Sequence, residues 1–256
     1  MGCWNSKAKD KNDIMSHMVR QRRQGACVEM FYETLHTIGH GSMGTVSRVR
    51  HLPTGSEYAL KTIQLARISP KMVQEMRNEI DVLKRLDHPN IIRAIETFES
   101  KRRVYLVMEL CTGGDLTRRG PYTETVAAHL ILSAVSYMHD QGVSHRDLKL
   151  ENVMYESHDP DAEIQVIDFG LSKIYLKHGK LMHEMVGTLY SMAPEVILGE
   201  YDESCDMWSV GVMAFILLSG DMPFDCTTQK RLLKSIEAGH YEFRGRRWKK
   251  ISMEAR

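Results

Sequence analysis

The chain has 256 residues and a mass of 29.4 kDa, with 43% hydrophobic and 26% charged residues, which is a globular composition and excludes a disordered, collagen-like or disulfide-scaffold protein. Its 34 Lys and Arg nearly balance its 33 Asp and Glu, which disfavours a protein that binds nucleic acid over its whole surface. The longest apolar run, Val210 to Leu218, is about half the roughly 20 residues that span a bilayer. The five cysteines form neither a CxxC pair nor a zinc-ligand spacing, so we expect a reducing, cytoplasmic environment.

Residues 1–30 are predicted to form a flexible basic arm. The first 24 residues carry six Lys or Arg against two Asp, a local net charge of +4, and show no apolar periodicity. The sequence begins Met-Gly-Cys-Trp-Asn-Ser, which matches the pattern for myristoylation of Gly2, with Cys3 available for palmitoylation. Two acyl chains and the basic arm would anchor the protein to a membrane surface. The alternative is an unmodified tail.

The next part of the chain favours strands. Short β-rich runs between Phe31 and Ile63 are separated by glycine-rich turns, which predicts an antiparallel meander. Ser69 and Pro70 then predict the start of a helix, because serine caps helix N-termini and proline fits the first turn. Further along, we expect a strand at 104–108 and helices at 123–140 and 206–219. The chain therefore divides into a small β-rich half and a larger helical half.

A glycine-rich loop and two charged residues indicate a phosphate site in the β-rich half. Gly39, Gly41 and Gly44 follow the spacing G-x-G-x-x-G and precede Val46, and glycines let backbone amides approach phosphates. A dinucleotide-binding fold would need a helix at the third glycine, whereas this sequence continues as a strand. Lys61 on the next strand and Glu79 on the following helix are predicted to form a buried ion pair, the alternative being two solvated charges.

Three further motifs occur in a fixed order. They are His145-Arg146-Asp147-Leu148-Lys149-Leu150-Glu151-Asn152, Asp168-Phe169-Gly170 and Ala193-Pro194-Glu195. With the glycine loop, the lysine and the helical glutamate, this set resembles the eukaryotic protein kinases over residues 32–256. The resemblance implies an α+β, bilobal kinase fold: a small antiparallel β-sheet lobe with one helix (about 31–108), a hinge (109–114) and a mainly helical lobe (115–256).

The resemblance also implies a role for each matched residue in transferring a phosphoryl group from ATP. Lys61 would hold the α- and β-phosphates and pair with Glu79, Asp147 would accept the proton of the acceptor hydroxyl, and Lys149 would contact the γ-phosphate. Asn152 and Asp168 would ligate Mg²⁺ or Mn²⁺, since hard cations prefer oxygen ligands. The remaining ATP contacts implied are Gly39, Gly41, Gly44, Val46, Ala59, Glu109, Cys111, Asp115 and Met154.

The residues in and around these motifs also indicate the branch of the family. Lys149 follows Asp147 by two residues and Gly187-Thr188 precedes Ala-Pro-Glu, as in serine/threonine kinases. The chain is similar to the calcium-dependent kinases of plants and protists, a group that favours protein substrates with basic residues upstream of the Ser or Thr. Asp115 and Glu151 stand where such kinases receive an upstream arginine, the alternative being ordinary surface acids. No EF-hand calcium loop occurs in the sequence.

The sequence departs from the family at its end. Ser252 to Arg256 resemble the opening of a helix that continues in relatives, so we expect a truncated C-terminal lobe in which Glu195 lacks its usual arginine partner. A non-catalytic, nucleotide-binding interaction module is therefore the alternative function, and a membrane-tethered adaptor is a second. The basic segment Arg244 to Lys250 is interpreted as a solvated loop rather than a nucleic-acid site, because no stacking platform accompanies it beyond Trp248.

The activation segment suggests how activity is controlled. Arg146, which precedes the catalytic aspartate, would clamp a loop phosphate in related kinases, yet the later half of the segment 170–187 has no Ser or Thr. Glu184 lies three residues before Gly187, where many relatives carry the phosphorylated threonine. Its carboxylate is predicted to supply a permanent negative charge to Arg146. The alternative is a solvated glutamate among nearby basic residues.

Overall fold

The chain folds into two units that are each discontinuous in sequence. The computed structural model describes residues 20–22, 27–41, 44–118, 124–175 and 181–252. The first unit contains the chain up to residue 66 together with 94–108, and the second contains 67–93 and everything from 109 onward. The predicted acylation sites Gly2 and Cys3 lie outside the described residues, so they stay predictions of the sequence.

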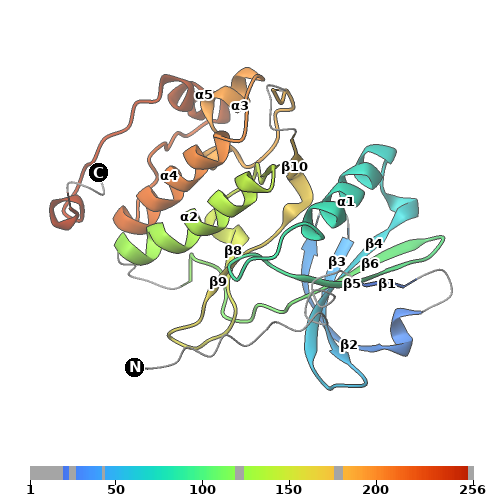
Figure 1. Cartoon of the computed structure of the whole chain (residues 1–256). Coiled ribbons are helices and arrows are strands. Elements are labelled where there is room, and N and C mark those ends of the chain that lie inside the picture. Colours follow the sequence, from blue (N-terminus) through green and yellow to red (C-terminus); the bar gives the residue numbers. More distant parts are fainter. Residues whose placement is uncertain (1–19, 23–26, 42–43, 119–123, 176–180, 253–256) are drawn as a thin grey trace, which may run out of the picture. The chain divides into compact units, whose positions relative to one another are not determined.

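The first unit is built on a twisted sheet, drawn in blue and green in Figure 1. Five antiparallel strands follow one another in the order β5, β6, β4, β3, β2, which confirms the predicted meander. A β-carbon on Gly44 would lie 1.9 Å from the carbonyl oxygen of Thr62, so glycine is required there by strand packing alone. The strands are β2 (Tyr32–Gly41), β3 (Gly44–His51), β4 (Glu57–Gln64), β5 (Ala94–Glu99) and β6 (Arg103–Met108).

Two stretches of the N-terminal segment form regular structure, which the prediction of a flexible arm did not include. Residues Arg20–Arg22 form β1, which adds a parallel strand to the edge of the sheet beside β5. A 3₁₀ turn, η2 (Val28–Met30), follows, and Val28 is buried in the core. The prediction of a flexible arm over residues 1–30 was therefore wrong for these two stretches. An exposed sheet edge can be paired by a polar strand without apolar periodicity, because backbone groups make the ladder.

One core cluster of the first unit lies on one face of this sheet. Tyr32 is 4% exposed, and its ring meets Phe98 edge-on at 6.2 Å between centroids. The Tyr32 hydroxyl donates a hydrogen bond of 2.5 Å to Oε1 of Glu96, which is also buried. A buried carboxylate needs such donors to offset the loss of water. The cluster as a whole contains Val28, Tyr32, Val49, Leu60, Phe98 and Val107.

The second unit begins with helix α1 (Pro70–Leu83), whose start was predicted correctly. Ser69 is the N-cap, and its Oγ accepts a hydrogen bond of 3.3 Å from the amide of Met72. The sequence placed this helix in the β-rich half, whereas the structure groups it with the helical unit. The Asn78 side-chain amide donates a 2.5 Å hydrogen bond to the carbonyl oxygen of Ser172, which ties α1 to the chain that follows Asp168-Phe169-Gly170.

The remainder of the second unit is mainly helical, as predicted. Helix α2 packs against α4, and the two run side by side in Figure 1. Strand β7 pairs with β10, and β8 pairs with β9. The loop with Asp147 lies between β7 and β8, and the turn with Asp168 lies between β9 and β10. The elements are α2 (Glu124–Asp140), α3 (Pro194–Leu198), α4 (Cys205–Ser219), α5 (Gln229–Ala238), β7 (Val143–Ser144), β8 (Val153–Tyr155), β9 (Ile164–Val166), β10 (Lys173–Ile174) and the 3₁₀ turns η3 (Leu65–Arg67), η4 (Leu150–Asn152), η5 (Phe169–Leu171), η6 (Leu189–Ser191) and η7 (Trp248–Lys250).

The basic segment 244–250 is only partly a solvated loop. Trp248 is buried, and its ring lies 4.8 Å from that of Phe215 between centroids. Arg247 Nη1 donates a 2.9 Å hydrogen bond to the carbonyl oxygen of Ser219 at the end of α4. The neighbouring Arg244, Arg246, Lys249 and Lys250 are exposed.

Among the described residues, no helix is both long enough and apolar enough to span a bilayer.

The Tyr32–Glu96 hydrogen bond yields a stability prediction. Tyr32→Phe keeps the ring but removes one hydrogen-bond donor from a buried carboxylate, which should lower the free energy of unfolding by about 1–3 kcal/mol. Urea unfolding followed by fluorescence measures this change. Tyr105→Phe is the control, because among the described residues the Tyr105 hydroxyl takes part only in an exposed hydrogen bond with Arg103. Equal stability of Tyr32→Phe and the parent would contradict the prediction.

Candidate active site

The loop that carries Asp147 is held by one buried carboxylate at the start of α4. Asp206 is 0% exposed. Its Oδ2 accepts hydrogen bonds from the amide of His145 at 2.8 Å and from Oγ of Ser144 at 3.1 Å, and its Oδ1 accepts one from the amide of Arg146 at 2.8 Å. These bonds fix the backbone immediately before Asp147, including the left-handed conformation of Arg146, where φ is 65°.

A fourth donor completes the shell of this carboxylate. His139, at the end of α2, places Nε2 2.9 Å from Oδ2 of Asp206. Burial alone would raise the pKa of Asp206, but the hydrogen bonds from His139 and the loop amides lower it below its usual range. Asp206 is therefore an anion within the protein, and it joins α2, α4 and the catalytic loop.

Asp147 lies at the centre of a set of polar contacts. Its Oδ1 accepts a 2.7 Å hydrogen bond from Oγ1 of Thr188, and its Oδ2 lies 3.0 Å from Nζ of Lys149. Lys149 also donates to Thr188 Oγ1 at 2.8 Å. The Asn152 amide donates to the carbonyl oxygen of Asp147 at 2.9 Å and to Oδ2 at 3.3 Å. The structure thus brings together three residues to which the sequence assigned roles in phosphoryl transfer, Asp147, Lys149 and Asn152, and adds Thr188 of the activation segment.

The second predicted metal ligand, Asp168, lies on a tight turn beside this loop. Asp168 has φ 61°, and its Oδ1 accepts a 3.4 Å hydrogen bond from the amide of Gly170. Phe169 is completely buried and packs edge-on against the ring of His145 at 4.9 Å. His145 Nδ1 accepts from the amide of Asp147 at 3.3 Å, so Nε2 carries the proton that faces the carbonyl oxygen of Ile167 at 3.1 Å. The Asp168 side chain itself is exposed.

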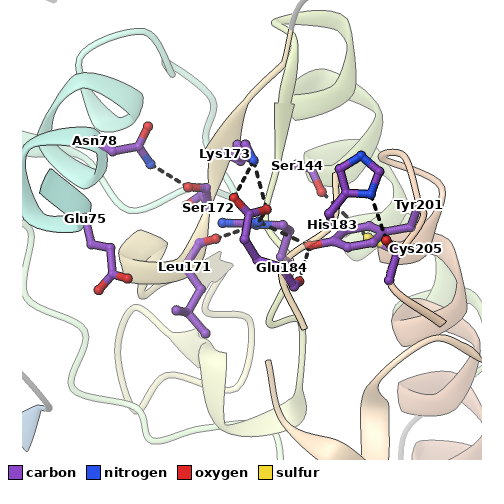
Figure 2. A network of polar contacts seen from close by, with 12 residues as sticks. Glu75, Asn78, Ser144, Leu171, Ser172, Lys173, His183, Glu184, Tyr201 and Cys205 are labelled. Carbon is purple, nitrogen blue, oxygen red and sulfur yellow. Dashed lines mark hydrogen bonds and ion pairs between the residues drawn. The ribbon is translucent and has the colours of Figure 1, made fainter. Parts of the chain in front are cut away.

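The predicted pairing of Arg146 with Glu184 is present. Arg146 Nη1 lies 3.3 Å from Oε2 of Glu184, and Arg146 Nε donates a 2.7 Å hydrogen bond to the carbonyl oxygen of Leu171. Lys173, on β10, donates to both oxygens of the same carboxylate, at 2.8 and 2.9 Å. Figure 2 shows Lys173 pointing toward the carboxylate of Glu184. The carboxylate is thus engaged, although the Glu184 side chain remains 50% exposed.

Tyr201 connects this network to the end of the activation segment. Its hydroxyl accepts a 3.1 Å hydrogen bond from Arg146 and donates one of 2.7 Å to the backbone carbonyl of Glu184 (Figure 2).

The hydrogen bond from Lys173 lowers the pKa of Glu184 to about 2, and Arg146 adds to this effect. Gly187 has φ 108°, and a β-carbon there would lie 2.5 Å from the carbonyl oxygen of Arg146, so the segment passes the loop where only glycine fits.

In the first unit, the predicted nucleotide-binding residues lie on β2, β3 and β4. Gly39 and Gly41 are on β2, and the residues between Gly41 and Gly44 lie outside the described part of the chain. Lys61 on β4 pairs in register with Val46 on β3. Ala59, two residues earlier on β4, is 7% exposed. One sheet therefore carries all of these positions.

In the second unit, backbone contacts join the hinge and Asp115 to strand β8. Asp115 pairs with Met154 in an antiparallel bridge, and Gly113 donates its amide to the carbonyl oxygen of Tyr155. Cys111 Sγ lies 3.6 Å from Oε1 of Gln165. Burial raises the pKa of Cys111 to about 12, with a further contribution from the carboxylate of Glu109. Burial also raises the pKa of Glu109.

The ion pair expected between Lys61 and Glu79 would join the two units, and it stays a prediction. Glu79, on α1, is 2% exposed. Its Oε2 lies 3.9 Å from the place where a β-carbon on Gly170 would stand. The helical glutamate is thus close to Asp168-Phe169-Gly170 within the second unit.

The donor chemistry at Asn152 and Asp168 fits a hard divalent cation. Asn152 uses its amide nitrogen on Asp147, which leaves the carbonyl oxygen as the ligand atom. Among the described residues, no group of three or more His, Cys, Asp or Glu side chains could hold a metal ion. One amide oxygen and one carboxylate suit a hard divalent cation, which prefers oxygen ligands.

Several residues of the site were missed by the sequence analysis. Asp206 was placed only as the first residue of a helix, because an acid in the first turn is an ordinary helix-start signal and does not indicate burial. Lys173 and Tyr201 belong to no recognised motif, because their contacts with Glu184 depend on the path of the activation segment.

Glu195, in the first turn of α3, is half-buried. Within the described residues, no basic group lies within salt-bridge distance of its carboxylate.

Comparison with known proteins places these features in a family. The family model described as "Protein kinase domain" matches residues 32–256. The chain belongs to the protein kinase family. This match covers every site residue above, and it confirms the resemblance inferred from the ordered motifs.

The similar relatives include calcium-dependent kinases. The chain is 38% identical over 255 residues to calcium-dependent protein kinase 5 of Plasmodium berghei, covering 96% of this chain and 44% of that protein. It is 42% identical over 234 residues to calcium-dependent protein kinase 4 of Plasmodium falciparum, covering 88% and 44%. A serine/threonine-protein kinase H1 homolog of Pinctada fucata is 41% identical over 233 residues, covering 88% and 55%. The chain therefore spans about half the length of these relatives, and the similarity supports the serine/threonine branch.

The Glu184 network yields a prediction about local stability. The amides of Met182 and Tyr201 donate to each other's carbonyl oxygens, at 2.7 and 3.1 Å, next to this network. Glu184→Gln keeps the shape but removes the charge, so the hydrogen-exchange protection of both amides should fall by about 2- to 5-fold, as a partly exposed ion pair is worth about 1 kcal/mol or less. Mass spectrometry of exchanged peptides measures this. Glu200→Gln, an exposed glutamate nearby, is the matched control.

The lowered pKa of Glu184 sets the pH range in which its charge protects the amides of Met182 and Tyr201. Its stabilisation is present above the ordinary pKa of 4.5 and is lost as the pH falls toward about 2. Protection factors of these amides in the parent should therefore be constant between about pH 5 and 8. A variant as protected as the parent would refute the contribution of the charge.

Proposed function

We propose that this chain transfers the γ-phosphate of ATP to serine or threonine hydroxyls of protein substrates that carry basic residues upstream. The observation that carries the proposal is the arrangement at Asp147, where a carboxylate is held by Lys149, Thr188 and Asn152. Phosphoryl transfer requires mainly positioning and neutralisation of charge. A fixed carboxylate beside a lysine meets both requirements.

Asp147 would orient the acceptor hydroxyl and accept its proton. The contacts with Thr188 and Lys149 would give way to the hydroxyl and the γ-phosphate, since both donors are side chains that can rotate. Asn152 and Asp168 would hold the divalent cation, which neutralises phosphate charge when bound. On the first unit, Lys61 would position the α- and β-phosphates.

Exchanging the Asp147 carboxylate for an amide tests the reaction. Asp147→Asn should lower phosphate transfer to a serine peptide by at least about 100-fold, because proton transfer and orientation are lost, while ATP affinity stays within about 2-fold. Transfer of radiolabelled phosphate and binding of a fluorescent ATP analogue are the two measurements. Lys61→Met should impair transfer as well, through lost phosphate positioning.

The outcomes separate the enzyme from the alternative. Undiminished transfer by Asp147→Asn would contradict the role of the carboxylate. A parent chain that binds ATP but transfers no phosphate would favour the non-catalytic, nucleotide-binding module.

We also infer that activation does not require phosphorylation of the activation segment. Glu184 contacts Arg146 and Lys173 with a carboxylate where a loop phosphate would otherwise pair with the arginine. A carboxylate carries about −1, against about −1.5 to −2 for a phosphate, so the ordering is weaker but always present.

Kinase assays on the Glu184 variants test this inference. Glu184→Gln and Glu184→Ala should lower kcat/KM by about 5-fold, the equivalent of roughly 1 kcal/mol for a partly exposed pair. Glu200→Gln is the control, and phosphatase treatment of the parent should leave its activity intact. Loss of activity after phosphatase treatment would overturn the inference.

Two further proposals come from the sequence. Myristoylation of Gly2 and palmitoylation of Cys3, with the basic arm, would place the chain on a membrane surface. The similarity to calcium-dependent kinases suggests calcium control. Because the sequence contains no EF-hand loop, calcium would have to be sensed by another chain or by a segment beyond these 256 residues.

A further inference from the structure

One side of helix α4 forms a wall of an apolar cavity. The cavity has a volume of about 370 Å³, which lies in the range of about 300–1,000 Å³ that is typical of ligand sites. The residues of α4 that line it recur every three or four positions, including Trp208, Gly211 and Leu218, so they lie on one side of the helix. Leu218 follows Trp208 by ten positions, which is a length of about 15 Å along a helix. The cavity is therefore elongated along α4.

A second wall is formed by aromatic residues that follow α5. The ring centroids of Phe243 and Trp248 lie 6.0 and 4.8 Å from that of Phe215, and the ring of Tyr241 lies edge-on to Phe243 at 5.5 Å. Trp248 is buried, but Tyr241 is 47% exposed and Phe243 is 39% exposed. Exposed aromatic rings gathered around a cavity are more typical of a binding surface than of a closed core.

Gly211 shows that the cavity has room beside the helix. Among the described residues, a β-carbon on Gly211 would meet no heavy atom within 4 Å beyond its own turn of helix. Glycine inside a helix is unfavourable, and no packing contact requires it here, in contrast to Gly44. The middle of the α4 wall therefore opens onto unfilled space.

A polar cavity of about 290 Å³ adjoins the apolar one at the end of α4. Leu218 lines the apolar cavity, and the next residue, Ser219, lines the polar one. Trp248 and Arg247 are related in the same way, so the cavities meet at two separate points of the chain. The lining of the polar cavity is completed by Gly220, Asp221, Arg244, Gly245 and Arg246.

Arg246 is the cation of the polar cavity that the fold does not use. Arg247 donates a hydrogen bond to the carbonyl oxygen of Ser219, and Arg244 forms an ion pair with Glu242. Arg246 is exposed, and in the described part of the chain no carboxylate lies within salt-bridge distance of it. With three arginines against one aspartate in its lining, the polar cavity carries a net positive charge.

We propose that the two cavities together bind a single-chain anionic amphiphile, a long-chain fatty acid, with its hydrocarbon chain along α4 and its carboxylate on Arg246. An apolar cavity takes up a hydrocarbon chain because burial removes apolar surface from water. A guanidinium pairs with a carboxylate through parallel hydrogen bonds. The site uses none of the residues assigned to phosphoryl transfer, so it stands apart from the proposed function.

Binding to the full chain tests the proposal without any variant. Two of the three tryptophans, Trp208 and Trp248, line the apolar cavity, so intrinsic fluorescence reports its occupancy. The probes are octanoate, decanoate and dodecanoate, each below its micelle concentration, and the neutral decanol. Kd should fall by about 2- to 4-fold for each added methylene, because each one buries more apolar surface. Decanoate should bind at least about 3-fold more tightly than decanol, because only decanoate is charged.

Filling the apolar cavity tests where the chain lies. Gly211→Leu should weaken dodecanoate binding by at least about 10-fold, because the added side chain takes the space of several methylenes. Ala214→Leu, on the same wall, repeats the test, and circular dichroism compares the fold of both variants with that of the parent. Gln74→Leu, at an exposed position of α1, is the matched control and should bind as the parent does.

Removing the cation tests where the carboxylate lies. Arg246→Gln should weaken decanoate binding by about 5-fold and leave decanol binding unchanged, because only the ionised head group pairs with the guanidinium. Arg85→Gln, at another exposed arginine, is the matched control and should change neither affinity.

Four results would overturn the proposal. They are an affinity that does not depend on chain length, equal binding of decanoate and decanol by the parent, unchanged dodecanoate binding by folded Gly211→Leu and Ala214→Leu, and unchanged decanoate binding by Arg246→Gln. Sedimentation velocity adds a further arm. A parent that binds no fatty acid but forms a dimer that Gly211→Leu dissociates would identify the cavity as a contact between copies of the chain, and would also overturn the proposal.

Discussion

The buried carboxylate of Asp206 is the contact on which the site depends. It accepts hydrogen bonds from the consecutive backbone amides of His145 and Arg146 and from side chains on two other elements. Because buried amides without partners are costly, the loop has one favourable conformation once α4 is in place. Arg146 is held at positive φ in that conformation, and the orientations of both Arg146 and Asp147 follow from it.

Charged contacts hold the activation segment against the catalytic loop. Arg146 reaches the activation segment through Glu184 and Tyr201, and Lys173 holds the same carboxylate from β10. Further along the segment, Thr188 contacts Asp147. The segment is therefore attached to the catalytic loop at two places. The hydrogen bond from Tyr190 to Glu151 repeats the pattern, with a loop residue fixed by a residue of the segment.

Local signals predicted the elements well where a single physical requirement dominated. Ser69 and Pro70 marked the start of α1 because a cap and a first-turn proline act within a few residues. The strands of the meander followed from β-rich runs between turns. The failures arose where backbone pairing was non-local: β1 joins β5, a strand far along the sequence, and its polar residues show no periodicity. Nor could a local pattern assign α1 to the helical unit.

The sequence by itself determined the family, the catalytic loop, the metal-ligand candidates and the pairing of Arg146 with Glu184, because phosphoryl transfer restricts residue types at fixed spacings. The tertiary structure alone decided which groups hold those residues in place. Asp206, Lys173 and Tyr201 act through contacts between segments far apart in the chain, and Tyr190 meets Glu151 across 39 positions. Such contacts depend on burial and on the path of the backbone, and neither quantity is encoded in a short pattern of residues.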